Sequence, residues 1–390
     1  MSLTPFTEEH EMYRQSLRRF IEAEIIPNVE RWEVEKICER AIFEKMGELG
    51  FIGPNYPTEY GGGGMDFWSA VVFSQEMAYA NCGGLSMSLF AHTYLPLPLI
   101  NAIGSEEQKQ GYLKPALQGK KICGLAITEP SGGSDVGGMK TFAKDMGDHY
   151  VINGSKMWIT NGNLADFIVL SAKTGEGYDV TLFIFDTKTP GFQAIPVKHK
   201  LGMHTSDTSQ LFFENCIVSK SAVLGMPSMG FYYLMNNIQE ERLIAAVLST
   251  YSAEWAFERA KKYARERETF GRQLAKFQVI RHKLSEMAVA LEACKAITFE
   301  AIRQFMAAGS ASTKIITIAK LFATENSIKI IDEALQIHGG WGYMEEYGIA
   351  RAWRDARLTT IGAGTSEIMH EIISKLVIDE IQHEKQLLNH

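Results

Sequence analysis

Apolar positions recur at intervals of three and four residues in two separate stretches of the chain. Within residues 7–50, Tyr13, Leu17 and Ile21 follow this spacing, which places them on one face of a helix. Helical patterning continues to about residue 118, and Ser105, placed before two glutamates and a glutamine, is expected to cap a helix. The second stretch contains four helical runs, at residues 228–265, 275–308, 312–337 and 365–382.

The stretch between them, residues 122–220, has a different pattern. Its apolar runs are short, rich in β-branched and aromatic residues, and separated by Gly, Asn, Asp and Pro. Such runs are typical of strands joined by turns, so this part is expected to be an antiparallel β domain. The fold class is therefore α+β, with helices and strands in separate domains. We expect an N-terminal all-α domain at 1–121, a middle β domain at 122–225, and a C-terminal four-helix bundle at 226–390.

Composition narrows the class of protein. No apolar run reaches the roughly 18–20 residues that span a bilayer, and a net charge of −7 with pI near 5.9 argues against nucleic-acid binding. The N-terminus is acidic and resembles neither a signal peptide nor a transit peptide, which favours a cytoplasmic location. Five scattered cysteines without metal-ligand spacing predict reduced, buried thiols and no metal site.

Two polar segments of the β domain are candidates for ligand binding. The first reads Leu125-Ala-Ile-Thr-Glu-Pro-Ser-Gly-Gly-Ser-Asp135, and the second reads Met157-Trp-Ile-Thr-Asn-Gly162. Small residues let a backbone approach a ligand closely and offer N–H and hydroxyl donors. Trp158 alone would be interpreted as a core aromatic residue. Its occurrence at this spacing from the first segment is a more specific indication of a ligand-binding site.

The C-terminal helices carry three further segments. The segment at residues 265–272, taken by itself, is a charged helix end that stops at Gly271. A separate run of glycines, 61–64, lacks the Lys-Ser/Thr of a phosphate loop and predicts only a turn. The three segments are Arg265-Glu-Arg-Glu-Thr-Phe-Gly-Arg272, Gln336-Ile-His-Gly-Gly-Trp-Gly-Tyr-Met344 and Ile361-Gly-Ala-Gly-Thr-Ser-Glu367.

These five segments, in this order, resemble the acyl-CoA dehydrogenases, flavoenzymes that desaturate acyl thioesters. The resemblance covers essentially the whole chain and implies the three-domain fold of that family, with FAD as cofactor. It also implies a homo-oligomer, commonly a tetramer, because neighbouring subunits share FAD contacts in this family. Electron-transfer flavoprotein is the implied electron acceptor.

The same resemblance implies site residues. Arg267 is assigned to the FAD pyrophosphate, for which a guanidinium fork is well suited. Ser134 and Ser206 are expected along the CoA chain, with Tyr232 near the acyl chain. The implied FAD contacts are Leu125, Ile127, Thr128, Gly133, Ser134, Trp158, Ile159, Thr160, Arg267, Thr269, Phe270, Gln278, Gln336, Gly339, Gly340, Thr365 and Glu367.

The catalytic base is the main departure from the common pattern. Many family members have a glutamate where this chain has Ala363, although the backbone N–H that binds the thioester oxygen remains, followed by Gly364. A subset carries its glutamate on another helix, before an arginine, and here Glu241 and Arg242 match that pair. Glu241 also falls on an apolar helical stripe, whereas Glu240 projects about 100° away. We therefore assign Glu241 as the base and Arg242, Ala363 and Gly364 to substrate binding.

Substrate length stays open at this level. The string 239–243 resembles long-chain and citronellyl-CoA dehydrogenases, whereas 361–367 resembles isovaleryl-CoA dehydrogenase, so a medium, long or branched acyl chain is expected. The predicted product is a trans-2-enoyl-CoA. Two alternatives are a flavin oxidase or monooxygenase on the same fold, and a non-catalytic flavin-binding scaffold supported only by Ala363.

Overall fold

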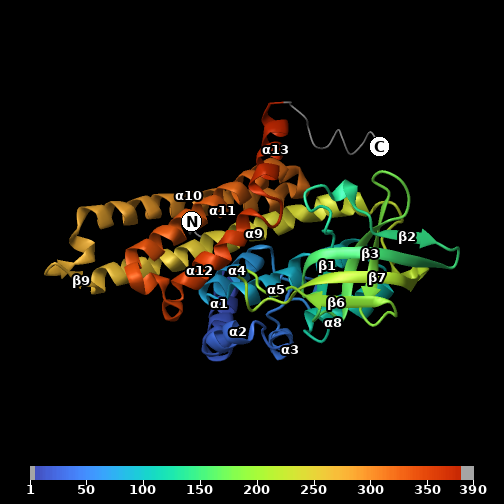
Figure 1. The fold of residues 1–390 in the computed structure, drawn as a ribbon, viewed down its shortest axis with the longest axis horizontal. Coiled ribbons are helices and arrows are strands. Elements are labelled where there is room, and N and C mark those ends of the chain that lie inside the picture. The colour runs from blue at the N-terminus through green and yellow to red at the C-terminus, as the bar shows by residue number, and fades with distance from the viewer. Residues whose placement is uncertain (1–4, 379–390) are drawn as a thin grey trace.

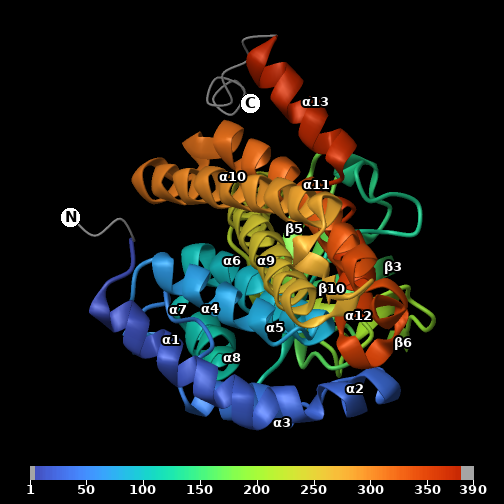
Figure 2. The ribbon, with the colours of Figure 1, turned by 90° about the vertical axis from the view of Figure 1, so that its left-hand side faces the viewer.

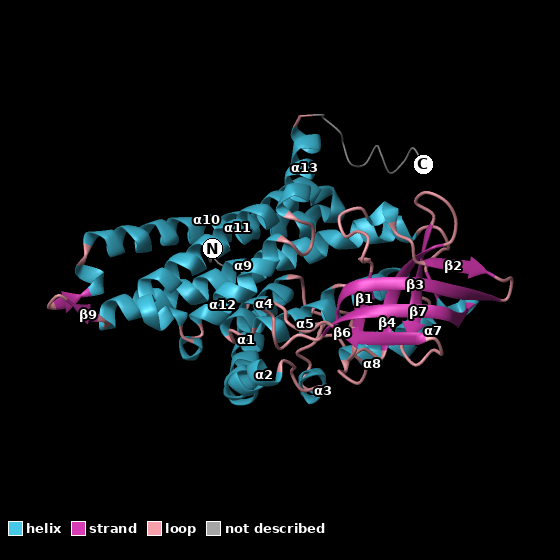
Figure 3. Ribbon diagram, viewed as in Figure 1, coloured by secondary structure: helices cyan, strands magenta, loops and turns pink. Residues whose placement is uncertain are grey.

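Helices and strands are segregated along the chain in the computed structural model, which describes residues 5–378 (Figure 1 and Figure 3). Helices extend to Leu117, strands run from Cys123 to Leu224, and helices return at Gly230. The predicted α+β class and its helix–sheet–helix order are therefore confirmed. The last predicted helical run begins as expected, but residues 379–382 of it lie outside the described residues.

Two of the N-terminal helices begin at capping boxes. Thr7 accepts the N–H of His10, and Ser105 accepts the N–H of Gln108 at 3.2 Å while the Gln108 side chain accepts the N–H of Ser105. The predicted cap at Ser105 is thus confirmed. The helices are α1 (Glu8–Phe20), α2 (Val29–Glu35), α3 (Ala41–Glu48), α4 (Trp68–Tyr79), α5 (Gly83–Tyr94), α6 (Pro96–Ile103), α7 (Glu106–Gln108) and α8 (Lys114–Leu117).

The middle domain is an eight-stranded sheet with the strand order β6-β7-β3-β2-β4-β5-β8 and β1 attached to β4. Most neighbouring strands are antiparallel, as predicted, but β1 pairs in parallel with β4, and β2 also pairs in parallel with β4 at Phe142 and Lys173. The chain enters β1 from the helical domain and not through a hairpin, so no tight turn fixes its direction. The strands are β1 (Cys123–Ala126), β2 (Phe142–Asp145), β3 (His149–Thr160), β4 (Phe167–Lys173), β5 (Val180–Asp186), β6 (Phe192–Pro196), β7 (Thr208–Ser219) and β8 (Val223–Leu224).

Helix α9 (Gly230–Glu266) is the longest element and lies between the N-terminal helices and the rest of the C-terminal bundle (Figure 2). Its 37 residues extend about 55 Å. Its start adjoins the sheet, and its end leads into the small hairpin β9 (Glu268–Thr269) and β10 (Arg272–Gln273). Within residues 5–378, no helix is both long and apolar enough to cross a bilayer. The remaining helices are α10 (Gln278–Ala308), α11 (Thr313–His338), α12 (Ile349–Ala356) and α13 (Ser366–Val377).

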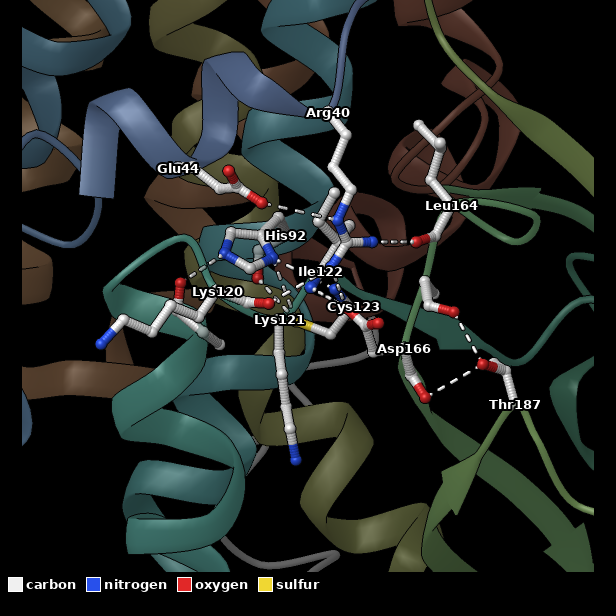
Figure 4. A network of polar contacts seen from close by, with 12 residues as sticks. Arg40, Glu44, His92, Lys120, Lys121, Ile122, Cys123, Leu164, Asp166 and Thr187 are labelled. Atoms are coloured by element: carbon white, nitrogen blue, oxygen red, sulfur yellow. Dashed lines mark hydrogen bonds and ion pairs between the residues drawn. The ribbon is translucent and has the colours of Figure 1, made fainter. Parts of the chain in front are cut away.

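A polar network joins the helical domain to the sheet where β1 begins (Figure 4). Arg40 pairs with Asp166, whose carboxylate also accepts the N–H of Ile122 at 2.8 Å. The Nδ1 of His92 accepts the N–H of Cys123, so its Nε2 donates to a backbone carbonyl and burial lowers the pKa of this imidazole to about 4. His92 is therefore a neutral structural residue. All five cysteines are free and buried, as predicted.

A buried ion pair fixes the loop that follows β1. The ammonium of Lys156 is fully buried and lies 3.0 Å from the carboxylate of Glu129, and it also donates to the carbonyl of Ile127. Burial lowers the pKa of Lys156 to about 8. Burial opposes ionisation of Glu129, but Lys156 and the N–H groups of Lys140 and Thr141 hold its pKa below the ordinary value. One carboxylate thus anchors both ends of the loop.

Replacing Lys156 by Met should destabilise the sheet by about 3–5 kcal/mol, because it leaves the Glu129 carboxylate buried without its partner. Thermal unfolding should show a clearly lower Tm, and the double variant Lys156→Met/Glu129→Gln should recover part of the loss. Lys144→Met, an exposed position on β2, is the control and should change little. An equal Tm for Lys156→Met and wild type would contradict this role.

Candidate functional site

Glu241 is a half-buried carboxyl on α9, beneath the segment that joins α12 to α13. No hydrogen bond to its carboxylate forms within residues 5–378. Burial raises the pKa of Glu241 to about 7, although Arg242 and Lys320 favour the charged form. A carboxyl with this pKa can take up or release a proton at neutral pH.

Two buried cations flank this carboxyl. Arg242 is 5% exposed, and its Nε has no hydrogen-bond partner among the described residues. Lys320, on α11, is fully buried, and its Nζ donates to the carbonyl of Gly364 at 2.6 Å. Burial, reinforced by Arg242, lowers the pKa of Lys320 to about 8. Sequence reasoning missed Lys320, although a lone lysine among Ile316, Ala319 and Ala323 was a usable signal.

The segment 361–365 closes over these cations. Ala363 has φ +55°, and Gly364 has φ +89°. A Cβ on Gly364 would stand 2.6 Å from the methyl carbon of Met369 and 3.7 Å from a guanidinium nitrogen of Arg242. The segment ends where the Thr365 hydroxyl caps α13. Gly364 therefore lies beside the same two cations that act on Glu241.

The two predicted segments of the sheet lie side by side. The N–H of Met157 donates to the carbonyl of Thr128 at 2.8 Å, which places the loop after β1 beside the end of β3. The β3–β7 register shifts between Lys156 and Ile159, and Trp158 adopts φ +62° within this bulge. Its ring is consequently turned outward and is 58% exposed, whereas the Ile159 side chain is buried. An outward indole beside a loop of small polar residues is a surface on which a flat aromatic ring can lie.

The two serines predicted to contact CoA differ in their exposure. Ser134 is exposed on the loop after β1, whereas Ser206 is 4% exposed and its hydroxyl donates to the carbonyl of Asp207. Helix α5 packs tightly here, since a Cβ on Gly84 would lie 2.5 Å from the Ser206 nitrogen. The Ser206 side chain therefore faces the protein interior, and the structure does not bring it to the surface that carries Ser134.

Most of the remaining predicted FAD residues gather at the far end of α9, whereas Thr365 and Glu367 begin α13 near Lys320. Phe270 and Gly271 both have positive φ and form the tight turn of the β9–β10 hairpin, and the Phe270 ring is 93% exposed. Tyr263 stacks on His338 with ring centroids 4.5 Å apart, which holds the hairpin end of α9 against the end of α11. The exposed residues brought together there are Arg267, Gln278, Gln336, Gly339 and Gly340.

The predicted cofactor residues thus form two groups at opposite ends of the molecule (Figure 1). From Glu241 to Arg267 the backbone follows one continuous helix, which corresponds to about 39 Å. The group at the sheet fits a flat ring, and the group at the hairpin fits phosphate oxygens, through a guanidinium and glycine N–H groups. The chemistry of both groups fits a flavin dinucleotide.

Family models match almost the whole chain. They are the acyl-CoA dehydrogenase N-terminal domain at residues 7–120, the middle domain at 124–216 and the C-terminal domain at 228–378. The chain is 37% identical to the long-chain specific acyl-CoA dehydrogenase of Sus scrofa over 385 residues, covering 97% of this chain and 88% of the relative. It is 38% identical to the short-chain specific acyl-CoA dehydrogenase of Clostridium acetobutylicum, covering 94% and 97%. It is also 38% identical to the caffeyl-CoA reductase–Etf complex subunit CarC of Acetobacterium woodii, covering 96% and 99%.

Solved structures agree with these matches. An acyl-CoA dehydrogenase from Geobacillus kaustophilus superposes with a TM-score of 0.93 at 36% identity, covering 96% of this chain and 99% of that one. A glutaryl-CoA dehydrogenase from Mycobacterium smegmatis in complex with FADH2 superposes with a TM-score of 0.90 at 28% identity, covering 96% and 95%. The family models over residues 7–378 and these relatives show that the chain belongs to the FAD-dependent acyl-CoA dehydrogenase family.

Proposed function

We propose that this enzyme removes the α-proton of an acyl-CoA with Glu241 and forms the trans-2-enoyl-CoA. The observation that carries the proposal is the Glu241 carboxyl itself, half-buried, without a hydrogen-bond partner among the described residues and with a pKa near 7. Ala363 cannot serve as a base, but its segment lies beside the same two cations as Glu241.

The surrounding residues have defined tasks in this proposal. A thioester α-proton is weakly acidic, so its removal requires stabilisation of the negative charge that develops on the thioester oxygen. The backbone N–H of Ala363 donates to that oxygen, and Lys320 holds the segment through the Gly364 carbonyl. Arg242 contacts the CoA portion and adds positive potential. FAD, when bound, would supply the acceptor for the hydride that leaves the β-carbon.

The separation of the two cofactor groups supports a homo-oligomer, proposed to be a tetramer. Arg267, Gln278 and the glycines after α11 are too distant from Glu241 to hold the flavin that Glu241 serves, so they bind the cofactor of a neighbouring subunit. Thr365 and Glu367 follow Gly364 at the start of α13 and lie near Lys320, so in this proposal they contact the flavin of their own subunit. Similarity to an Etf complex subunit supports electron-transfer flavoprotein as the redox partner.

The reaction direction has a second candidate. CarC is named a reductase, and a 3-(aryl)acrylate reductase of Clostridium sporogenes is 38% identical over 375 residues. The same residues can return a proton to the α-carbon, with Glu241 as the acid. The relatives named long-chain and short-chain acyl-CoA dehydrogenases favour the oxidative direction. Their names differ in acyl length, and for this chain we propose a medium, long or branched acyl chain.

Anaerobic titration of the yellow protein tests the proposal. Acyl-CoAs from isovaleryl through octanoyl and palmitoyl to citronellyl are added while the flavin absorbance is followed. Bleaching by one class identifies the substrate, and reoxidation of reduced protein by an enoyl-CoA identifies the reverse reaction. A flavin that dithionite reduces but no acyl-CoA bleaches would favour an oxygen-dependent or non-catalytic member.

Replacing Glu241 by Gln should leave a yellow, folded protein with turnover lower by about 10³-fold, since a general base contributes about 10²–10⁴-fold. Glu258→Gln, an exposed position on the same helix, is the matched control and should retain activity. The steady-state rates of wild type, Glu241→Gln and Glu258→Gln are compared at equal flavin content. Similar rates for the two variants would refute the assignment.

The pH profile should report the ionisation of Glu241. The base acts when deprotonated, so kcat/KM should rise with pH through about 7 and level off above it. Lys320→Met removes a charge that favours the carboxylate and should move this inflection to higher pH, whereas Lys320→Arg should leave it close to the wild-type position. Lys314→Met, exposed on the same helix, should not move it. An unchanged inflection in Lys320→Met would rule out this electrostatic coupling.

A carboxylate at position 363 should partly restore activity to Glu241→Gly. Ala363 already adopts positive φ, so Ala363→Glu demands no new backbone conformation. The double variant Glu241→Gly/Ala363→Glu should turn over at least tenfold faster than Glu241→Gly alone. No recovery, with flavin still bound, would show that the two positions do not reach the same proton.

A further inference from the structure

Two buried carboxylates outside the proposed site hold opposite ends of one short segment, residues 203–207, in the connection from β6 to β7. Asp355, on α12, is 5% exposed, and Asp207, the last residue of the segment, is 6% exposed. Neither has a task in the proposed mechanism. A buried carboxylate is costly unless it is hydrogen-bonded, so the groups that these two carboxylates bind indicate their role.

The Asp207 end of the segment is bonded to the turn that follows β3. One carboxylate oxygen of Asp207 accepts the N–H of Asn163 at 2.7 Å and the N–H of Leu164 at 2.8 Å. The carbonyl of Asp207 accepts the N–H of Asn161 at 2.9 Å. This turn comes directly after residues 158–160, which are expected to contact the flavin ring. The position of those residues therefore depends on Asp207.

The helical domain holds the same turn from its other side. The side-chain amide of Asn161 donates to the carbonyls of Ser88 and Cys123 at 2.9 and 3.1 Å. Arg40 donates to the carbonyl of Leu164 at 3.1 Å (Figure 4). Asn161 is fully buried, so these bonds form away from water. The turn consequently has one defined position, to which Asp207 contributes three of the bonds.

The other end of the segment is attached to α12. The N–H of Met203 donates to the carboxylate of Asp355 at 2.5 Å, and Met203 is held at φ +53°. The preceding residue, Gly202, packs closely against the same helix. A Cβ on Gly202 would lie 2.7 Å from the carbonyl oxygen of Arg354 and 2.7 Å from the Asp355 carboxylate. Any side chain at position 202 would therefore push the segment away from α12.

Helix α12 is packed on the helix that carries the proposed base. Ala352 of α12 and Ala256 of α9 belong to one buried apolar cluster. After α12 the chain continues to the 361–365 segment, where Gly364 lies beside Arg242 and Lys320. Residues 203–207 thus run from the bundle that presents Glu241 to the turn beside the exposed indole.

The middle of the segment has little freedom to move. The carbonyl of Thr205 accepts the N–H of Cys38 at 3.1 Å, and Lys200 donates to the carbonyl of Ser206 at 2.5 Å. A Cβ on Gly84 would lie 2.3 Å from the Thr205 hydroxyl oxygen. Close-packed interiors transmit strain because their atoms have no space to relax into. A displacement of one end of the segment should therefore reach the other end.

We propose that Asp207 and Asp355 are positioning residues for the dehydrogenation, which act through residues 203–207 to place the flavin-contacting residues 158–160 relative to Glu241. The base and the flavin act on adjacent carbons of one acyl chain, and such groups must be held to within about 0.5 Å of the productive geometry. The inference rests on the proposed function.

Hydrogen–deuterium exchange of the flavin-loaded protein tests the connection without turnover. Asp207→Ala, Asp355→Ala and Gly202→Ala should each raise exchange in the peptide 158–165 by about tenfold. Within residues 5–378, neither Asp355 nor Gly202 is hydrogen-bonded to that peptide. Gly202→Ala displaces the same end as Asp355→Ala without removing a charge, so it decides the question if Asp355→Ala does not fold.

Glu76→Gln is the control for general destabilisation, because it weakens a buried ion pair with Arg18 in the helical domain. It should lower Tm and leave exchange in the peptide 158–165 unchanged. Wild-type exchange of this peptide in Gly202→Ala, or the same increase in Glu76→Gln, would overturn the inference.

Flavin-reduction rates at saturating acyl-CoA and equal flavin content test the consequence. Asp207→Ala and Gly202→Ala should each be slower than wild type by about tenfold, since small misplacements far from the chemistry are costly. Because both act through one segment, the double variant should be at most about threefold slower than the slower single variant, and not about 100-fold slower than wild type. Asp207→Asn keeps an acceptor for the two N–H groups and should recover most of the rate.

Two rate results would overturn this inference and leave the proposed function intact. Rate losses that multiply in the double variant would show two independent structural roles. An Asp207→Asn rate as low as that of Asp207→Ala would show that the charge of Asp207, and not its hydrogen bonds, affects the reaction. Failure of every acyl-CoA to reduce the wild-type flavin would overturn the proposed function, and the role in dehydrogenation with it, whatever the exchange result.

Discussion

The proposed chemistry depends on one half-buried carboxyl, Glu241, whose pKa is raised by burial while two neighbouring cations favour its charged form. Burial makes Glu241 basic enough to act near pH 7, while Arg242 and Lys320 keep its charged form accessible. The same two cations stand next to the 361–365 segment, where other family members place their base. A pocket with fixed positive charge can therefore receive a carboxylate from either of two backbones, which explains how Ala363 is compatible with an active family member.

The length of α9 sets the second constraint. Its first turns adjoin the sheet with the exposed Trp158, and its last turn leads to Arg267, about 55 Å away at the other end of the helix. A rigid helix cannot fold these groups together, which supports the proposal that a second copy of the chain completes the flavin site. The buried Lys156–Glu129 ion pair contributes to the sheet end of the proposed site. It holds the loop after β1 against the bulge that turns Trp158 outward.

The sequence predicted what local patterns and ordered motifs encode. Helix runs matched within a few residues, and the cap at Ser105 was correct. Glu241 was assigned from the Glu-Arg pair that it forms with Arg242 and from its place on an apolar stripe, and its role as base stays a prediction. Long-range packing was not accessible. The parallel pairing of β1 depends on its entry from the helical domain, the burial of Ser206 depends on the close approach of α5, and Lys320 gains its role only from the carbonyl of Gly364.

In the proposed mechanism Glu241 removes the α-proton of the substrate. Exchange of this proton with solvent can be observed without the hydride transfer. Solvent deuterium incorporation at the α-carbon of a 3-thia-acyl-CoA, which binds but is not desaturated, isolates it. Mass spectrometry should show rapid incorporation with the wild type and with Glu258→Gln, and almost none with Glu241→Gln at equal flavin content. Incorporation at the wild-type rate in Glu241→Gln would contradict the account, because another group would then be the base.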